Sequence, residues 1–243
     1  MKKPTFRRVL AYIVDAVIIA IVASMFSTLT ILNPEKEKYN EVYKEYSNYI
    51  TEVMQSEEFS PDLINSEKMS DLSYNIVYYG VYTSIISLVL SFLYFGIFQY
   101  YTDGKTIGKL LFGIKVISTK DEKLNIIQVI IRSAIINSLL ASAVLIILVL
   151  YTSKAAYIKA NTYIQIIDNG LLLFSFCMVL YRQDGVGLHD LLAGTAVVNS
   201  YESYNDYKEV YKGVKEAEYK EVEHKEVEHK KKTTRKKTKK EDK

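Results

Sequence analysis

Long apolar segments alternate with strongly polar segments along this chain. Four segments contain almost no charged residues: about 9–32, 76–101, 126–151 and 164–181. An uncharged run of about 18 residues or more is long enough for an α-helix to cross the hydrocarbon core of a bilayer. The pattern therefore predicts an all-α membrane protein with four transmembrane helices. We assign them to one membrane domain, residues 1–199, followed by a charged tail, residues 200–243.

The insertion between the first two spans, residues 33–72, has an amphipathic pattern. Asn33-Pro34-Glu35 is typical of a helix start, and apolar side chains follow at helical spacing: Tyr39, Val42, Tyr43, Tyr46, Tyr49, Ile50 and Val53. We expect an outer amphipathic helix of about 20 residues that ends before Ser60-Pro61. Its tyrosine face either packs on the spans, which is the simpler interpretation, or lies on the membrane surface.

Two short segments outside the spans are rich in β-branched residues. They are Gly113–Ser118, between the second and third spans, and Gly194–Asn199, after the fourth span. Leu124–Ile126 is a third candidate piece. Such short runs next to turn residues are typical of strands, so we expect a small cytoplasmic β-element.

The distribution of charge carries more information than the average composition. The averages of 49% apolar and 24% charged residues would suit a soluble domain. Lysine and arginine are concentrated before the first span, between the second and third spans, and after the fourth. The insertion instead carries ten acidic residues against four lysines. Because basic segments stay on the cytoplasmic side, we expect a multi-pass protein of the cell membrane with both termini in the cytoplasm.

The N-terminal segment also fits a second interpretation, a cleaved signal peptide. Its apolar run is too long for a signal core, and it contains Asp15. We therefore expect a retained span.

The tail ends in a basic block, residues 230–240, with eight basic residues in eleven. Such a block is usually solvated, and the functional alternative is contact with anionic lipid headgroups. Specific nucleic-acid binding is not expected, because neither interleaved aromatic residues nor a folded binding module is visible.

Charged residues inside the predicted spans are the main candidates for function. Asp15 and Arg132 each lie six residues past the cytoplasmic start of a span, which places both about 9 Å into the membrane. Because a charged group facing lipid is costly, we expect these two side chains to pair across a helix–helix contact. Arg8 lies on the same face as Asp15 but about 10 Å away. We expect it to bind lipid phosphates at the membrane surface, or a group on another segment, such as Asp190.

Other polar residues are secondary candidates. Gln128 and Asn137 would satisfy the remaining donors and acceptors of the Asp15–Arg132 cluster. Asp168 is expected at the outer membrane interface rather than in the mechanism. His189 and Asp190 are expected to anchor the segment at Gly194 rather than to catalyse a reaction.

Three separated motifs together resemble the RDD family, which is named for one arginine and two aspartates. They are Arg8-Val-Leu-Ala-Tyr-Ile-Val-Asp15, the Gly-Lys-rich stretch Thr106–Val116, and Leu188-His-Asp190-Leu-Leu-Ala-Gly194. The resemblance implies that Arg8, Asp15 and Asp190 are the family's three named positions. It covers residues 1–199 and implies a multi-pass membrane protein with a suggested role in transport. The insertion and the tail have no counterpart in the family pattern.

Two functions remain open at this stage. The first is transport of a small cation or proton through a polar site at Asp15, which in a chain with only four spans favours a homo-oligomer. The second is a membrane scaffold or accessory subunit whose intramembrane charges fix helix packing. An enzyme is not expected, because no nucleophile accompanies His189, and neither a metal site nor a cofactor motif is visible. The single cysteine, Cys177, excludes an intrachain disulfide.

Overall fold

A computed structural model describes residues 4–55, 67–121 and 123–209. Within these ranges the chain is mostly helical and contains three helices long and apolar enough to cross a membrane. They are α1 (Thr5–Ser27), the continuous helix Val81–Tyr101 and α10 (Lys154–Tyr181). A bent pair, α8 (Ile126–Ile136) and α9 (Leu139–Tyr151), forms a fourth span if the two halves are counted as one. The basic block at 230–240 lies outside the described residues.

The spans that the sequence predicted differ from the observed helices at their ends. α1 begins at Thr5 and ends at Ser27, instead of covering 9–32. α10 begins at Lys154, ten residues before the predicted start, because its first turns carry lysines that the criterion of an uncharged run excludes. The second span begins at Val81 rather than at residue 76, after a break at Gly80. It consists of α5 (Val81–Phe92), the π-helix η1 (Leu93–Phe98) and the short α6 (Gln99–Tyr101).

The predicted third span is not one continuous helix. α8 and α9 meet at Asn137 and Ser138 with a bend of 64°, and Ser138 has a left-handed backbone, with φ of +52°. Neither residue is charged, so a search for uncharged runs passes over the break. Irregular backbone at membrane depth requires partners inside the protein. Here the Ser138 hydroxyl donates a hydrogen bond to the Asp168 carboxylate on α10.

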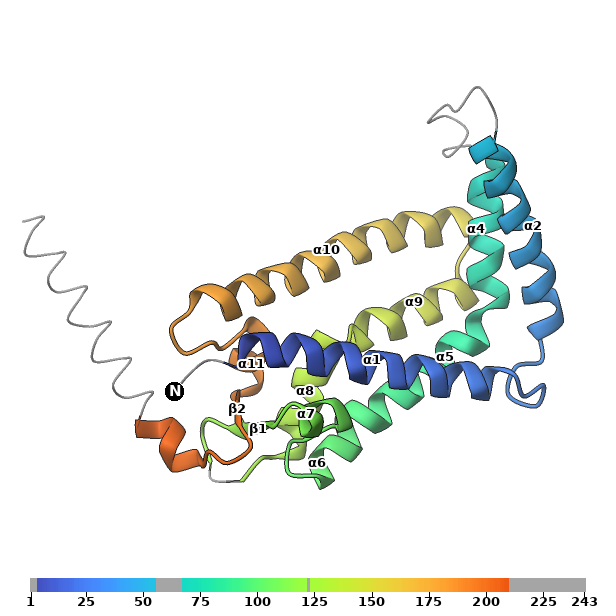
Figure 1. Ribbon diagram of the computed structural model, residues 1–243. Coiled ribbons are helices and arrows are strands. Elements are labelled where there is room, and N and C mark those ends of the chain that lie inside the picture. Colours follow the sequence, from blue (N-terminus) through green and yellow to red (C-terminus); the bar gives the residue numbers. More distant parts are fainter. Residues whose placement is uncertain (1–3, 56–66, 122, 210–243) are drawn as a thin grey trace, which may run out of the picture.

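The insertion forms a helical hairpin at one end of the long helices. α2 (Lys36–Gln55) confirms the predicted amphipathic helix, although it starts at Lys36 rather than at Asn33. It packs along α4 (Glu67–Tyr79), and the pair stands at a steep angle to α1 (Figure 1). Part of the tyrosine face of α2 lies in this contact: the Lys68 ammonium on α4 sits over the Tyr49 ring, and Val53 is buried. Tyr43, on the same face, is exposed, so the face packs against α4 only in part.

The β-element is present as predicted. β1 (Ile114–Ser118) and β2 (Thr195–Asn199) form an antiparallel pair, with Ile114 opposite Asn199 and Ser118 opposite Thr195. The third candidate piece is not part of it, because α8 begins at Ile126.

The sheet packs directly on the start of α1. The side chains of Ile114, Val116 and Val197 form a buried cluster with Ala11. Two short helices flank the sheet, α7 (Ile107–Leu111) and α11 (Leu188–Ala193), and both lie near the first turns of α1 (Figure 1). The loop before β1 and the segment before β2 therefore meet at one end of the long helices.

Candidate functional site

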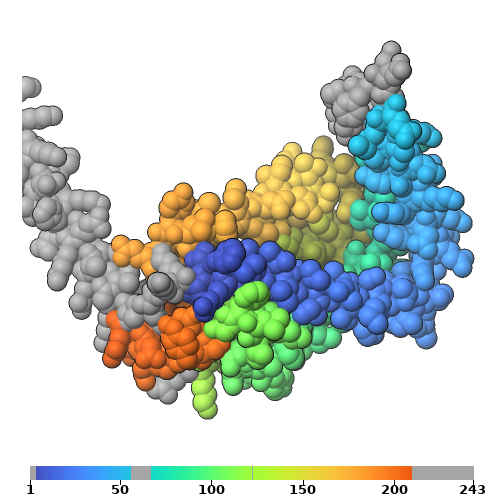
Figure 2. Space-filling model, viewed as in Figure 1, coloured from blue at the N-terminus to red at the C-terminus, as the bar shows by residue number. Residues whose placement is uncertain are grey.

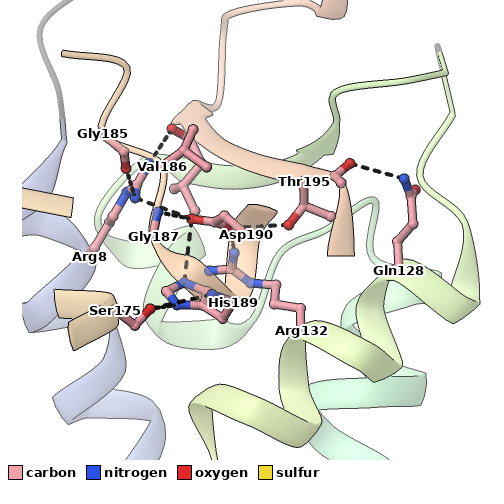
Figure 3. Close-up of polar contacts among 12 residues, drawn as sticks. Arg8, Gln128, Arg132, Ser175, Gly185, Val186, Gly187, His189, Asp190 and Thr195 are labelled. Atoms are coloured by element: carbon pink, nitrogen blue, oxygen red, sulfur yellow. Dashed lines mark hydrogen bonds and ion pairs between the residues drawn. The ribbon is translucent and has the colours of Figure 1, made fainter. Parts of the chain in front are cut away.

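Asp190 is the centre of a buried ionic network. Its side chain is fully buried and forms an ion pair with Arg132 on α8. Nη1 of Arg8, on α1, lies 3.6 Å from its other oxygen. The Thr195 hydroxyl, at the start of β2, donates a hydrogen bond of 3.1 Å to the same carboxylate. One carboxylate therefore joins α1, α8, α11 and β2, and Figure 3 shows these side chains converging on it.

The backbone around Asp190 explains how the carboxylate reaches this position. α11 begins directly after Gly187, and Asp190 is the third residue of the helix, where a carboxylate can bind the free N–H groups of the first turn. The Gly187 N–H donates to Asp190 Oδ2 at 3.4 Å. A Cβ at Gly187 would lie 2.9 Å from Ser175 Oγ and Val179, so only glycine permits this close approach to α10.

Arg8 also holds the connection between α10 and the sheet. Its Nη1 donates to the Gly185 carbonyl at 2.6 Å, and its Nη2 donates to the Val197 carbonyl at 2.9 Å. The prediction that Arg8 binds another segment, with Asp190 as the example, is confirmed.

His189 contacts both Asp190 and α10: its Nε2 lies 3.4 Å from Asp190 Oδ2. Its Nδ1 and the Ser175 hydroxyl on α10 share a hydrogen bond of 2.6 Å. Burial, reinforced by the charges of Arg132 and Arg8, lowers the pKa of His189 to about 2, so the ring is neutral. Of the two residues predicted to anchor the segment at Gly194, Asp190 does so through Thr195. His189 instead fixes α11 to α10.

Asp15 has a separate set of partners. It is 1% exposed and accepts three hydrogen bonds: from the Tyr94 hydroxyl at 2.6 Å, the Thr106 hydroxyl at 2.5 Å and the Gly108 N–H at 2.7 Å. The predicted pair with Arg132 is wrong. The argument from equal depth omitted the loop after the second span, which folds back and places α7 over Asp15.

Gly108 makes this approach of α7 to α1 sterically feasible. A Cβ at Gly108 would lie 2.2 Å from the Ala11 carbonyl oxygen and 2.9 Å from the Asp15 carboxylate carbon. The backbone of the loop therefore touches α1 directly, and its N–H reaches the carboxylate. Thr106 caps α7 at this point, since its side chain accepts a hydrogen bond from the Lys109 N–H at 3.3 Å.

Lys109 is a site residue that the sequence analysis did not single out. Its ammonium donates to Gln99 Oε1 at 2.8 Å. Burial, and then the charge of Arg132, lowers the pKa of Lys109 to about 7. Tyr94, Thr106 and Gln99 were also missed. The available signal was that the polar Gln99 lies in an apolar span and that Thr106 and Lys109 lie in a motif already noted.

A cavity of about 320 Å³ lies between these groups. Its polar lining includes Arg8, Asp15, Gln99, Lys109, Arg132 and Asn137. Its apolar walls come largely from α1 and α10 and include Val9, Tyr12, Leu172, Phe176 and Val179. Asp15 and Arg132 thus share this cavity without pairing with each other.

The remaining secondary candidates have other roles. Gln128 does not reach the Asp15 cluster: its amide nitrogen donates to Ser118 Oγ and to the Gly194 carbonyl, both at 3.0 Å, and so fixes the end of the sheet. Asn137 lines the cavity, and its amide nitrogen has no hydrogen-bond partner among the described residues. Asp168 lies near the middle of α10 and binds the break in the third span. The expectation that it lies at the outer interface stays a prediction, and the structure adds its hydrogen bond from Ser138.

Residues 3–194 match the RDD family. No curated protein and no solved structure matches the sequence. The match covers α1 to α11 and includes Arg8, Asp15 and Asp190.

Proposed function

We propose, from the premise that this chain belongs to the RDD family of membrane proteins, that it transports protons or small cations and that Asp15 is the exchange site. Its candidate spans make it a multi-pass membrane protein. Intramembrane ionisable groups are functional candidates by default, since a membrane protein retains them at a cost in free energy.

The observation that carries the proposal is the difference between the two buried carboxylates. Asp190 is held by two arginines, so protonating it would break ion pairs. Among the described residues, the hydrogen bonds to Asp15 come only from neutral groups. The hydroxyls of Tyr94 and Thr106 can accept as well as donate, so they can adjust when the carboxylate gains a proton. Asp15 can therefore alternate between charged and neutral forms without losing a counter-ion.

The same partners favour a proton over a metal cation. Alkaline-earth cations bind about six to eight oxygen ligands, whereas the described residues place only the Asp15 carboxylate and two hydroxyl oxygens, those of Tyr94 and Thr106, at this point. Lys109 lines the same cavity, and its pKa of about 7 makes it a second proton-exchanging group near neutral pH. We assign proton transfer to Asp15 and Lys109 together. Arg132 and Asp190 form a permanent ion pair that holds the surrounding helices in place.

We propose further that the end of the molecule carrying the sheet and Asp190 faces the cytoplasm. The support is the excess of lysine in the loop that contains α7 and β1, which is typical of cytoplasmic loops. Because four spans make a small transporter, we propose a homo-oligomer as the working unit.

The experiment is proton flux into proteoliposomes that contain the purified chain and a pH-sensitive dye. Imposing a membrane potential or a sodium gradient should change the internal pH for the wild type, and Asp15→Asn should abolish that change. Asparagine has the same shape and keeps one acceptor oxygen, so the protein should still fold. Glu41→Gln removes the same charge at an exposed position on α2 and should leave the flux unchanged. Absence of flux in the wild type would refute the proposal.

A second function, a scaffold or accessory subunit, is favoured by the Asp190 network. That network links four elements, and it can fix the packing of the helices in a protein that transports nothing across the membrane. The hairpin of α2 and α4 also projects from the long helices and offers a surface for a partner (Figure 2). In that case the wild type would show no flux, and Asp15→Asn would lower the amount of assembled protein instead.

A further inference from the structure

The cavity beside Asp15 has an excess of positive charge. Arg8, Lys109 and Arg132 all line it, whereas Asp15 is the one carboxylate in its lining. Asp190 lies behind the arginines and pairs with both of them. Lys109 has the Gln99 side-chain oxygen as its hydrogen-bond partner, and no carboxylate among the described residues forms an ion pair with it, although the charge of Asp15 raises its pKa. A negative charge that enters the cavity would supply a paired counter-ion.

Unpartnered hydrogen-bond donors point to the same kind of ligand. Gln99 is 1% exposed, and its amide nitrogen has no partner among the described residues. The same holds for Nε of Arg8 and for the amide nitrogen of Asn137. All three residues line the cavity. Buried donors without partners are unfavourable, and what would satisfy these three is an acceptor oxygen.

The walls of the cavity are suited to an apolar body. α1 contributes Val9 and Tyr12, and α10 contributes Leu172, Phe176 and Val179. Both helices are candidate spans, so the cavity lies beside the hydrocarbon layer. Its volume of about 320 Å³ is near the lower end of the range for small-molecule sites, about 300–1,000 Å³. A single short chain fits this space better than a phospholipid with two acyl chains.

We propose that this cavity binds a lipophilic carboxylate, such as a medium-chain fatty acid, with its carboxylate between Lys109 and the Gln99 amide and its chain between α1 and α10. This inference rests on the proposed proton transport and adds a second species to it, an anion that would move together with the proton. Gln99 and Lys109 are the specificity-determining pair. The Gln99 side-chain oxygen already accepts from the ammonium, while its amide nitrogen is buried and has no hydrogen-bond partner among the described residues, so a small rotation of the side chain would bring this donor to the ligand.

The arrangement also couples the carboxylate to a proton. A bound carboxylate stabilises the ammonium form of Lys109, and the ammonium form in turn strengthens binding of the carboxylate. The ligand and one proton therefore bind together without a net change of charge in the buried site. That pairing reduces the electrostatic cost of moving the ligand through an apolar layer.

The test is photo-crosslinking of the full chain in nanodiscs of phosphatidylcholine. A decanoate analogue with a diazirine in its chain is the probe, and mass spectrometry maps the labelled peptides. We expect labelling concentrated in residues 5–12 and 172–179. Excess decanoate should reduce it at least tenfold, and excess decyltrimethylammonium, which has the same chain and opposite charge, should not. Equal competition by both compounds, or labelling spread evenly over all the spans, would overturn the proposal.

Two variants sharpen the test. Gln99→Glu places a carboxylate beside Lys109 and should abolish the competed labelling. Ser87→Ala, in a second cavity between α5, α9 and α10, should leave it unchanged. If Gln99→Glu fails to fold, the comparison of decanoate with decyltrimethylammonium in the wild type still decides the question.

Other outcomes separate this proposal from the transport function. Competition by phosphatidylglycerol as strong as that by decanoate would identify a lipid headgroup as the ligand and would contradict a free carboxylate. Competed labelling without any proton flux would support the site while refuting transport. Flux without competed labelling would support transport while refuting this substrate class.

Discussion

Asp190→Asn tests whether the buried ionic network holds the membrane domain together. The asparagine retains an acceptor for the Thr195 hydroxyl, but it removes the negative charge that faces Arg132 and Arg8. Both arginines would then stay buried without a counter-ion. The perturbation therefore changes the charge and leaves the shape of the side chain nearly constant.

The expected loss of stability is large because Asp190 is fully buried. Removing one partner of a buried ion pair destabilises a protein by about 3–5 kcal/mol, since the other charge remains in a low dielectric. Arg132→Met should cost less than Asp190→Asn, because Arg8 still neutralises the carboxylate. In the double variant the Arg132 charge is absent as well. The double variant should therefore lose less stability than the sum of the losses in the two single variants, by about 1–3 kcal/mol.

The assay is unfolding of the purified chain in mixed micelles by increasing mole fractions of dodecyl sulfate, followed by circular dichroism. The wild type, the two single variants and the double variant give the coupling energy directly. Glu35→Gln is the matched control, because Glu35 pairs with Lys38 at 3.1 Å on the surface and exposed pairs contribute little. Glu35→Gln should unfold at the same mole fraction of dodecyl sulfate as the wild type.

Two results would refute the reasoning. One is an Asp190→Asn variant as stable as the wild type, which would mean that solvent reaches the arginines. The other is strict additivity of the two single variants, which would mean that Asp190 and Arg132 do not act as a pair.

Three further outcomes are expected. Gly108→Ala should separate α7 from α1, because its methyl group would lie 2.2 Å from the Ala11 carbonyl oxygen, and limited proteolysis should then cut the loop at residues 102–113 faster. The pKa of Lys109 is about 7 in the folded chain, against an ordinary value of 10.5, so the unfolded chain binds more protons between these values and stability should rise with pH across that window. The free energy of unfolding should rise by at most about 1.4 kcal/mol per pH unit in the wild type, and Lys109→Met should remove this rise. Unfolding measured at pH 7, 8 and 9 checks both expectations. Ser138→Ala should leave Asp168 without its hydroxyl donor and lower stability by about 1–3 kcal/mol in the same micelle assay, and an unchanged midpoint would contradict a role for that hydrogen bond.

Local patterns predicted the parts of the fold that depend on neighbouring residues. Uncharged runs identified the regions of the spans, because insertion in a bilayer depends mainly on the apolar character of a continuous segment. β-branched residues identified the strands that became β1 and β2. The helix ends were less accurate, since the turns at either end of a span carry charged residues that an apolar criterion excludes.

The sequence predicted most of the charged residues of the site, but it did not predict correctly which of them are in contact. Arg8, Asp15, Arg132 and Asp190 all stood out as charges in or next to apolar segments, and all four gather near one cavity or behind it. Lys109 was missed because it lies in a loop, where a lysine is ordinarily solvated. It is half-buried because α7 folds back onto α1 at Gly108.

The sequence by itself determined that this chain has helical spans, a strand pair and a small set of charges that lipid would reject. Only the tertiary structure decided which charge met which partner. Arg132 paired with Asp190, Asp15 received hydroxyl and amide donors, and Asn137 and Ser138 broke the third span. The physical reason is that a buried polar group must find a partner within about 3 Å, and that distance depends on how distant segments pack rather than on their order along the chain.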